Sequence, residues 1–243
     1  MSFDAPLPRF AGSCTALVTP FKNGAVDADS FCKLVDFQID NGTAGLVPVG
    51  TTGESPTLSH EEHDLVVELC IKQAAGRVPV IAGAGSNSTA EAVRLAEHAA
   101  TAGANAVLIV SPYYNKPTQA GLYAHFAAVA AAVDVPVIVY DIPGRSVGRV
   151  NDDTLARLAS DFANISGIKD ATADLVRPTA VQNLLGNDFT QLSGEDATAL
   201  PYLAAGGHGC ISVTANIAPK LLSEMHAAWW ASDIKTAQTI HQK

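Results

Sequence analysis

Short apolar runs recur along this chain, separated by longer stretches with the period of an amphipathic helix. The runs do not alternate polar with apolar residues, a pattern typical of parallel strands that are buried on both faces. We therefore predict eight parallel strands, at Cys14–Thr19, Gly45–Val49, Val78–Gly83, Ala106–Val110, Val135–Tyr140, Ile165–Lys169, Phe189–Leu192 and Gly209–Val213.

Helical patterns fill the intervals between these runs. One of them opens on a capping box formed by Ser59 and Glu62. Glycines stand where five of the helices should stop, at positions 42, 76, 103, 186 and 206. The predicted helices are Asp29–Asn41, Ser59–Ala75, Ser88–Ala102, Thr118–Ala132, Asp152–Ser160, Ala173–Leu185, Asp196–Ala205 and Ala215–Gln242.

Eight strands alternating with eight helices predict an α/β fold, a single (β/α)₈ TIM barrel that takes up residues 1–243 as one domain. The length of 243 residues suits this fold, which typically takes about 250. The rival is a doubly wound open sheet, which usually carries a glycine-rich turn after its first strand. Here that strand ends in Thr19-Pro20-Phe21-Lys22, with no such turn.

Composition narrows the class of protein. Hydrophobic residues make up 48% of the chain and charged residues 16%, which is enough apolar material for a large core. The formal net charge is −9 and no run of Lys or Arg occurs, which disfavours nucleic-acid binding. Residues 1–10 contain no apolar signal-peptide core and no apolar stretch is long enough to span a bilayer, so we expect no membrane segment and a cytoplasmic location.

The sequence offers no metal site. The four cysteines, at 14, 32, 70 and 210, are far apart and form no Cys-x-x-Cys pair. Glu195 and Asp196 are adjacent acids without a complementary histidine motif, and we expect them to cap the helix that begins there. We therefore expect chemistry without a metal or an organic cofactor.

Active sites of such barrels lie at the carboxyl ends of the strands. Lys169 ends the sixth predicted strand, so its amine should point toward the central cavity, where burial would lower its pKa and leave it nucleophilic. The plainer interpretation is a solvated loop lysine, the usual environment of this residue.

Other strand ends carry groups that suit the same chemistry. Thr51 and Thr52 lie between glycines after the second strand, and Tyr140 ends the fifth. Arg145 follows on a Pro-Gly turn and could bind a carboxylate through two parallel hydrogen bonds. The plain alternative for the threonines is polar filler in a loop, and for Arg145 it is a surface arginine paired with Asp141 or another acid. Tyr113 and Tyr114, after the fourth strand, could be an aromatic pair that shields the barrel mouth.

Taken together and in order, these residues are recognisable. The chain resembles the 4-hydroxy-tetrahydrodipicolinate synthase (dihydrodipicolinate synthase) family of class I pyruvate-dependent aldolases from about Gly12 to the end of the last helix. The resemblance is carried by Gly50-Thr51-Thr52-Gly53-Glu54, Tyr113-Tyr114-Asn115, Tyr140 with Pro143 and Arg145, and Gly167-Ile168-Lys169.

The resemblance implies a function. Lys169 would form a Schiff base with pyruvate, and the resulting enamine would attack L-aspartate 4-semialdehyde in a step of lysine (diaminopimelate) biosynthesis. Thr52, Tyr140 and Tyr114 would form a hydroxyl relay, with the residue equivalent to Tyr114 supplied by a neighbouring subunit of a homodimer or homotetramer. The implied substrate-binding residues are Thr51, Thr52, Arg145, Gly194 and Ile211.

The resemblance also implies possible feedback inhibition by lysine. The site in sensitive family members resembles a set of polar residues near the second and third helices. The ordinary alternative is polarity at helix starts and at an interface. The residues are Ser55, His60, His63, Asn87, Glu91 and Tyr113.

Two features depart from the family pattern. Asp141 follows Tyr140 where many members have Asn, which we expect to add negative charge beside Arg145 and weaken its hold on a substrate. The chain ends at Lys243, where family members usually continue into a small C-terminal helical extension, so we expect that extension to be missing and a surface near Trp229 and Trp230 to be bare.

Two alternative functions remain open. A sister aldolase of the N-acetylneuraminate lyase or 2-keto-3-deoxy-sugar-acid type would keep the lysine and the tyrosine, although Arg145 and the threonine pair favour the synthase. A non-catalytic barrel that only binds a ligand or a partner is the second alternative, because fold alone does not establish function.

Overall fold

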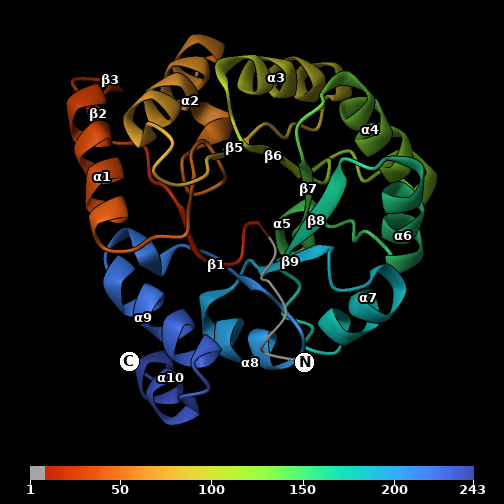
Figure 1. The fold of residues 1–243 in the computed structure, drawn as a ribbon. Helices are drawn as coiled ribbons and strands as arrows, with labels where there is room; N and C mark the ends of the chain where they lie inside the picture. The colour runs from red at the N-terminus through yellow and green to blue at the C-terminus, as the bar shows by residue number, and fades with distance from the viewer. Residues whose placement is uncertain (1–8) are drawn as a thin grey trace.

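The computed structural model describes residues 9–243 and shows a parallel barrel ringed by helices (Figure 1). The eight strands lie in the order β4-β1-β10-β9-β8-β7-β6-β5. The barrel closes where Leu46 of β4 bridges Val80 beside β5. All eight strand predictions are confirmed, as β1 (Gly12–Ala16), β4 (Gly45–Val47), β5 (Ile81–Gly83), β6 (Ala106–Val110), β7 (Val137–Asp141), β8 (Ile165–Asp170), β9 (Thr190–Ser193) and β10 (Gly209–Ser212).

The outer ring follows the predicted order of helices. The capping box of α2 is present, because Ser59 accepts a hydrogen bond from the Glu62 backbone and Glu62 accepts one from the Ser59 backbone. Gly103 ends α3 with a φ of 101°, a conformation that favours glycine. The ring consists of α1 (Ala28–Asp40), α2 (His60–Ala74), α3 (Thr89–Ala102), α4 (Gln119–Ala132), α6 (Asp152–Asp161), α7 (Arg177–Leu185), α8 (Ala199–Ala204) and α9 (Pro219–Trp230).

The structure also contains elements that the periodicity did not predict. A small hairpin, β2 (Phe21–Lys22) and β3 (Ala25–Val26), follows β1, and a one-turn helix, α5 (Pro143–Ser146), follows β7. The single last helix predicted over residues 215–242 is wrong. It divides into α9 and α10 (Ile234–His241), because Ser232 has a φ of 61° and the side chain of Asp233 caps the second helix.

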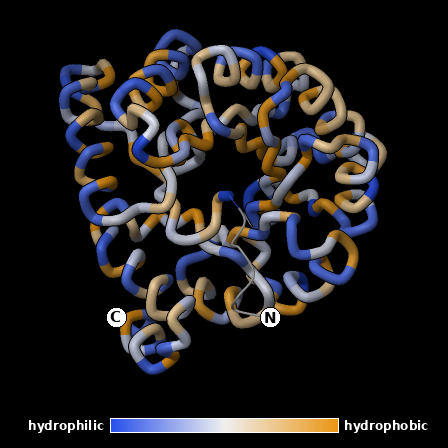
Figure 2. Tube along the Cα trace, viewed as in Figure 1, coloured by the Kyte–Doolittle hydropathy of each residue, from blue (hydrophilic) through white to orange (hydrophobic). Residues whose placement is uncertain are grey.

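The core has two main apolar layers, one inside the barrel and one between the barrel and the helix ring. The interior layer gathers inward-facing strand residues, among them Val47, Leu108, Tyr140, Leu192 and Ile211. A larger layer fills the space between the strands and α1 to α7, and apolar and polar segments alternate along the ring helices (Figure 2). A third cluster joins α8, α9 and α10.

The bare surface expected near Trp229 and Trp230 is partly covered. Both indoles are half-buried and pack against the third cluster, which includes Ala237 of α10. In Figure 1 α10 lies outside the ring beside α9, where it shields this edge.

Several sequence expectations concern the molecule as a whole. Cys14, Cys70 and Cys210 are buried free thiols, and Cys32 is a half-buried free thiol. Glu195 caps the 3₁₀ turn before α8, as expected, whereas Asp196 instead accepts hydrogen bonds from the backbone of Val213 and Thr214. Residues 1–8, which carry most of the signal-peptide argument, lie outside the described residues.

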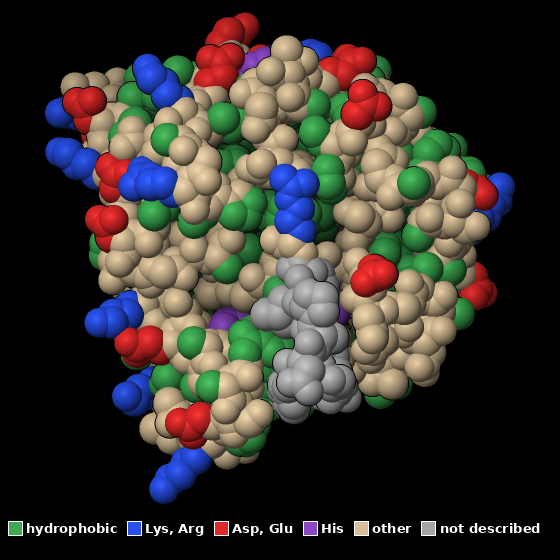
Figure 3. All heavy atoms as spheres, in the orientation of Figure 1, with side chains coloured by type: hydrophobic (Ala, Val, Ile, Leu, Met, Phe, Trp, Pro, Cys, Tyr) green, Lys and Arg blue, Asp and Glu red, His purple; other side chains and the backbone are tan. Residues whose placement is uncertain are grey.

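The described residues also bear on membrane and metal binding. Within residues 9–243 no helix combines the length and apolarity needed to cross a membrane. The same part of the chain contains no group of three or more His, Cys, Asp and Glu side chains placed to hold a metal ion. On the face seen in Figure 3, acidic and basic side chains are interspersed rather than gathered into a basic stripe.

Candidate active site

Lys169 projects into the barrel from the carboxyl end of β8. It is the register partner of Tyr140 on β7, and residues paired across neighbouring parallel strands point to the same face. Tyr140 belongs to the interior layer, and the Lys169 amine lies 4.2 Å from the centre of its ring. Lys169 is only 6% exposed, so the solvated loop lysine of the plainer interpretation is not what the structure contains.

Burial changes the chemistry of this amine. It lowers the pKa of Lys169 from 10.5 to about 8, although the nearby Cys210 and Asp196 act in the opposite direction. A neutral amine is a nucleophile, whereas an ammonium group is not. Lys169 can therefore add to a carbonyl carbon near neutral pH.

Gly194, directly after β9, makes room for the lysine. A methyl group built on Gly194 would lie 3.1 Å from Cε of Lys169 and 2.7 Å from the methyl of Ala171. Any larger residue would therefore displace the lysine side chain. Ile211 of β10 is fully buried in the interior layer, below the cavity that the strand ends surround.

Tyr140 contacts Thr51 in the turn after β4. Burial raises the pKa of Tyr140, while a hydrogen bond with Thr51 and the charge of Arg145 lower it. Thr51 lines the cavity, whereas Thr52 is not among the lining residues. The turn begins at Val49, a buried residue with a φ of 48°, which is an unusual conformation for a β-branched side chain.

Beside the Lys169 amine, Tyr140 and Thr51 line a cavity of about 230 Å³ at the mouth of the barrel, whereas Lys169, Gly194 and Ile211 are not among the residues lining this cavity. Arg145 reaches it from α5, which places a guanidinium group at the edge of the cavity. Apolar residues make up part of the lining. The residues from the predicted sites that line the cavity are Thr51, Ser55, Tyr113, Tyr140 and Arg145.

Asp141 does not lie beside Arg145, and the expectation that it weakens the grip of Arg145 on a substrate is wrong. Its side chain is fully buried on the other side of β7, where one carboxylate oxygen lies 2.6 Å from Nη1 of Arg177. The cause is strand alternation, because successive side chains point to opposite faces and Tyr140 points inward. The alternative pairing of Arg145 with Asp141 is wrong for the same reason.

Tyr114 points away from this cavity. It is 89% exposed and has a φ of 71°, which is uncommon for a residue of this size. Its neighbour Tyr113 lines the cavity and accepts, through its carbonyl oxygen, a hydrogen bond from the Asn87 side chain at 3.2 Å. Within a single chain, therefore, the predicted relay residue Tyr114 does not join Lys169 and Tyr140.

The six residues of the predicted lysine site occupy different environments. Ser55 and Tyr113 line the cavity, and Asn87 donates to Tyr113. His60 lies 2.7 Å from Glu91, whose other oxygen accepts a hydrogen bond from Ser86. These two bonds lower the pKa of Glu91. His63 instead is buried in the core, where its pKa falls to about 4 by desolvation, against the opposing effect of Asp64.

The sequence interpretation missed Ser86 and Arg177. Ser86 follows β5 in a loop of small residues, where nothing local marks it as the partner of a glutamate. Arg177 opens α7 and is only 2% exposed. Charged residues are almost never fully buried unless they are paired. A single sequence does not show which residues pair, so a buried arginine has no signature in it.

Comparisons with known proteins agree with this geometry. A family model described as the dihydrodipicolinate synthetase family matches residues 9–243. A 4-hydroxy-tetrahydrodipicolinate synthase from Bradyrhizobium diazoefficiens is 61% identical over 235 residues, which cover 97% of this chain and 79% of that protein.

Two solved structures have the same fold. The chloride-inhibited dihydrodipicolinate synthase from Acinetobacter baumannii, complexed with pyruvate, superposes with a TM-score of 0.92 at 49% identity, over 96% of this chain and 80% of that one. A DHDPS from Cyanidioschyzon merolae with lysine bound superposes with a TM-score of 0.92 at 37% identity, over the same shares of the two chains.

The lowered pKa of Lys169 predicts how its reactivity depends on pH. Acetylation by acetic anhydride, followed by peptide mass spectrometry, should rise with pH to a midpoint near 8, because only the neutral amine reacts. An ordinary lysine has its midpoint about two units higher. The same peptide in denatured protein, where the amine is solvated, is the control. Superimposable curves for the folded and the denatured protein would contradict the buried-amine account.

Proposed function

Because this chain belongs to the dihydrodipicolinate synthetase family, we propose that it catalyses the reaction of 4-hydroxy-tetrahydrodipicolinate synthase. This lyase condenses pyruvate with L-aspartate 4-semialdehyde in the diaminopimelate route to lysine. The observation that carries the proposal is the buried Lys169 amine beside Tyr140, at the end of a barrel strand where such enzymes react.

The first half of the reaction needs a neutral amine. Nζ of Lys169 adds to the ketone carbon of pyruvate, and loss of water from the carbinolamine gives the Schiff base. Removal of a methyl proton then converts the imine to an enamine. The pyruvate complex of the Acinetobacter relative, at 49% identity, supports pyruvate as the keto acid.

Proton transfer falls to the hydroxyl groups around the amine. We assign the transfer to Tyr140 and, in place of Thr52, to Thr51, because Thr51 is the threonine that contacts Tyr140. We leave Thr52, with the backbone of the same turn, for the pyruvate carboxylate. Gly194 and Ile211 would bound the pyruvate pocket, since Gly194 abuts the Lys169 side chain.

Arg145 supplies the recognition of the second substrate. Its guanidinium borders the cavity, and an arginine can hold a carboxylate through two parallel hydrogen bonds. L-aspartate 4-semialdehyde carries such a carboxylate. The enamine then attacks the aldehyde carbon, and closure of the ring by the substrate amine on the imine carbon releases Lys169.

Aldehyde preference separates this function from that of a sister aldolase. With pyruvate present, turnover should be at least a hundredfold faster with L-aspartate 4-semialdehyde than with N-acetylmannosamine or glyceraldehyde. Arg145→Gln should weaken binding of the semialdehyde by about 2 kcal/mol, as expected for a hydrogen bond to a charged group, and leave pyruvate binding intact. Steady-state assays measure both effects, and faster turnover of a sugar aldehyde would contradict the proposal.

We further propose that the active unit is a homodimer or a larger homo-oligomer. Tyr114 is too exposed to serve its own cavity, and a second copy could receive it beside Tyr140. Tyr114→Phe should then reduce turnover with little effect on pyruvate binding. Sedimentation velocity measures the oligomeric state, and a fully active monomer would contradict the proposal.

Lysine is proposed as a feedback inhibitor that binds near His60 and Glu91. The carboxylate of Glu91 could pair with an ammonium group, and Asn87 and Tyr113 lie in contact beside it. The lysine-bound relative at 37% identity supports lysine as a ligand. Calorimetry should detect binding at millimolar lysine and lose it in Glu91→Gln. Absence of binding to the parent protein would remove the proposal.

The remaining proposals concern organisation and location. We propose that residues 1–243 act as one domain, which the continuous strand order of the barrel supports. We also propose that the protein works in the cytoplasm. Fractionation of producing cells tests the location, and recovery outside the cytoplasm would contradict it.

A further inference from the structure

Strand alternation places two aspartates directly behind the catalytic pair. Asp141 follows Tyr140 on β7, Asp170 follows Lys169 on β8, and the two aspartates are themselves register partners. Since Tyr140 and Lys169 point into the barrel, the aspartates point outward to the helix layer. Both are buried, with exposures of 0% and 3%.

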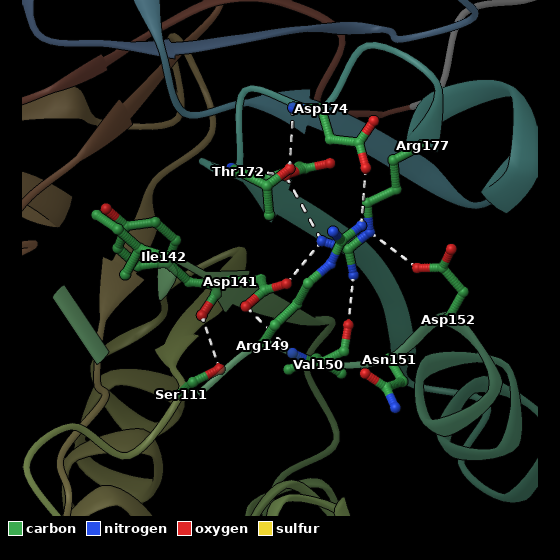
Figure 4. A network of polar contacts seen from close by, with 12 residues as sticks. Ser111, Asp141, Ile142, Arg149, Val150, Asn151, Asp152, Thr172, Asp174 and Arg177 are labelled. Atoms are coloured by element: carbon green, nitrogen blue, oxygen red, sulfur yellow. Dashed lines mark hydrogen bonds and ion pairs between the residues drawn. The ribbon is translucent and has the colours of Figure 1, made fainter. Parts of the chain in front are cut away.

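Arg177 holds both carboxylates from the start of α7. Nη1 lies 2.6 Å from Asp141 and 3.6 Å from Asp170, and Nε lies 2.8 Å from Asp152. Figure 4 shows the guanidinium group between Asp141 and Asp152. The acids around it raise the pKa of Arg177, although burial alone would lower it.

The same arginine fixes the segment that carries Arg145. Nη2 of Arg177 donates to the carbonyl oxygen of Val150 at 2.7 Å, and the Val150 amide donates to Asp141 at 3.2 Å. Arg145 lies between Asp141 and Val150 along the chain. Both ends of the segment that presents it are therefore tied to one buried ion pair.

We propose that Arg177 is a positioning residue whose hold on the two outward aspartates sets how Lys169 and Tyr140 meet inside the barrel. The effect of Arg177 on turnover rests on the proposed function, whereas its effect on the geometry of Lys169 and Tyr140 does not. The planar guanidinium group is suited to this task, because it donates in several fixed directions at once. A lysine in its place would keep the charge but contact the acids from one point only.

The test compares Arg177→Lys with Arg77→Lys. Arg77 pairs with Asp36 at 2.6 Å in a half-exposed ion pair that lies outside the segment of residues 141–150, and it is the matched control. Turnover is divided by the number of sites that borohydride traps with pyruvate, so that unfolded protein does not count. Arg177→Lys should lower this ratio by roughly tenfold to a hundredfold, the effect of misplacing reacting groups by about 1 Å. The control should stay within twofold of the parent.

A crystal structure of Arg177→Lys tests the geometry without turnover. The distance from the Lys169 amine to the centre of the Tyr140 ring, 4.2 Å in the parent, should change by about 1 Å, the scale at which misplaced groups lose reactivity. An unchanged distance, or a ratio within twofold of the parent, would overturn the proposal. If Arg177→Lys does not fold, Asp170→Asn replaces it in both measurements, with the same criteria. If the parent protein traps no pyruvate, the proposed function is refuted but the positioning role is not. The distance from the Lys169 amine to the Tyr140 ring still tests that role.

Discussion

The structure depends on one unfavourable burial, that of the Lys169 amine at the mouth of an apolar barrel. An ammonium group there would lose its hydration, so burial favours the neutral amine and the pKa of Lys169 falls to about 8. Lysines are almost never this buried without a partner. Here the aromatic ring of Tyr140 lies beside the amine, and Gly194 leaves the space it occupies. The Lys169 amine is therefore made nucleophilic by its packing and not by a neighbouring base.

The barrel separates this chemistry from the charges that support it. Because side chains alternate along β7 and β8, each strand end presents one residue to the cavity and the next to the helix layer. The inner pair is an amine with a lowered pKa beside a phenol, whereas the outer pair forms ion pairs with Arg177. Breaking a buried ion pair costs several kcal/mol, about 3–5 when one partner is removed, so the outer layer is a rigid support for the inner one.

Much of this arrangement could be predicted from the sequence. Apolar runs and capping signals predicted all eight strands and the order of the ring helices, since both depend on local patterns. Lys169 was found because its strand ends in a residue that seldom follows an apolar run. The division of the last helix was missed, because a left-handed residue such as Ser232 leaves no apolar signal.

The errors at the site have a common physical cause. Asp141 was placed beside Arg145 because the two are close in sequence, but a strand turns adjacent residues to opposite faces. The burial of His63 likewise depends on how a helix is oriented. Arg177 lies eight residues beyond Lys169 and meets Asp141 only through the fold. Local sequence patterns do not predict the direction of side chains in irregular segments, and they do not predict long-range ion pairs.

The central claim is that Lys169, and no other lysine, forms the Schiff base. Incubation with pyruvate and sodium borohydride, followed by peptide mass spectrometry, tests it most directly. The account predicts one reduced pyruvyl adduct per chain, on the peptide that contains Lys169, and none in a folded Lys169→Arg variant. Folded protein without an adduct, or with the adduct on another lysine, would contradict it.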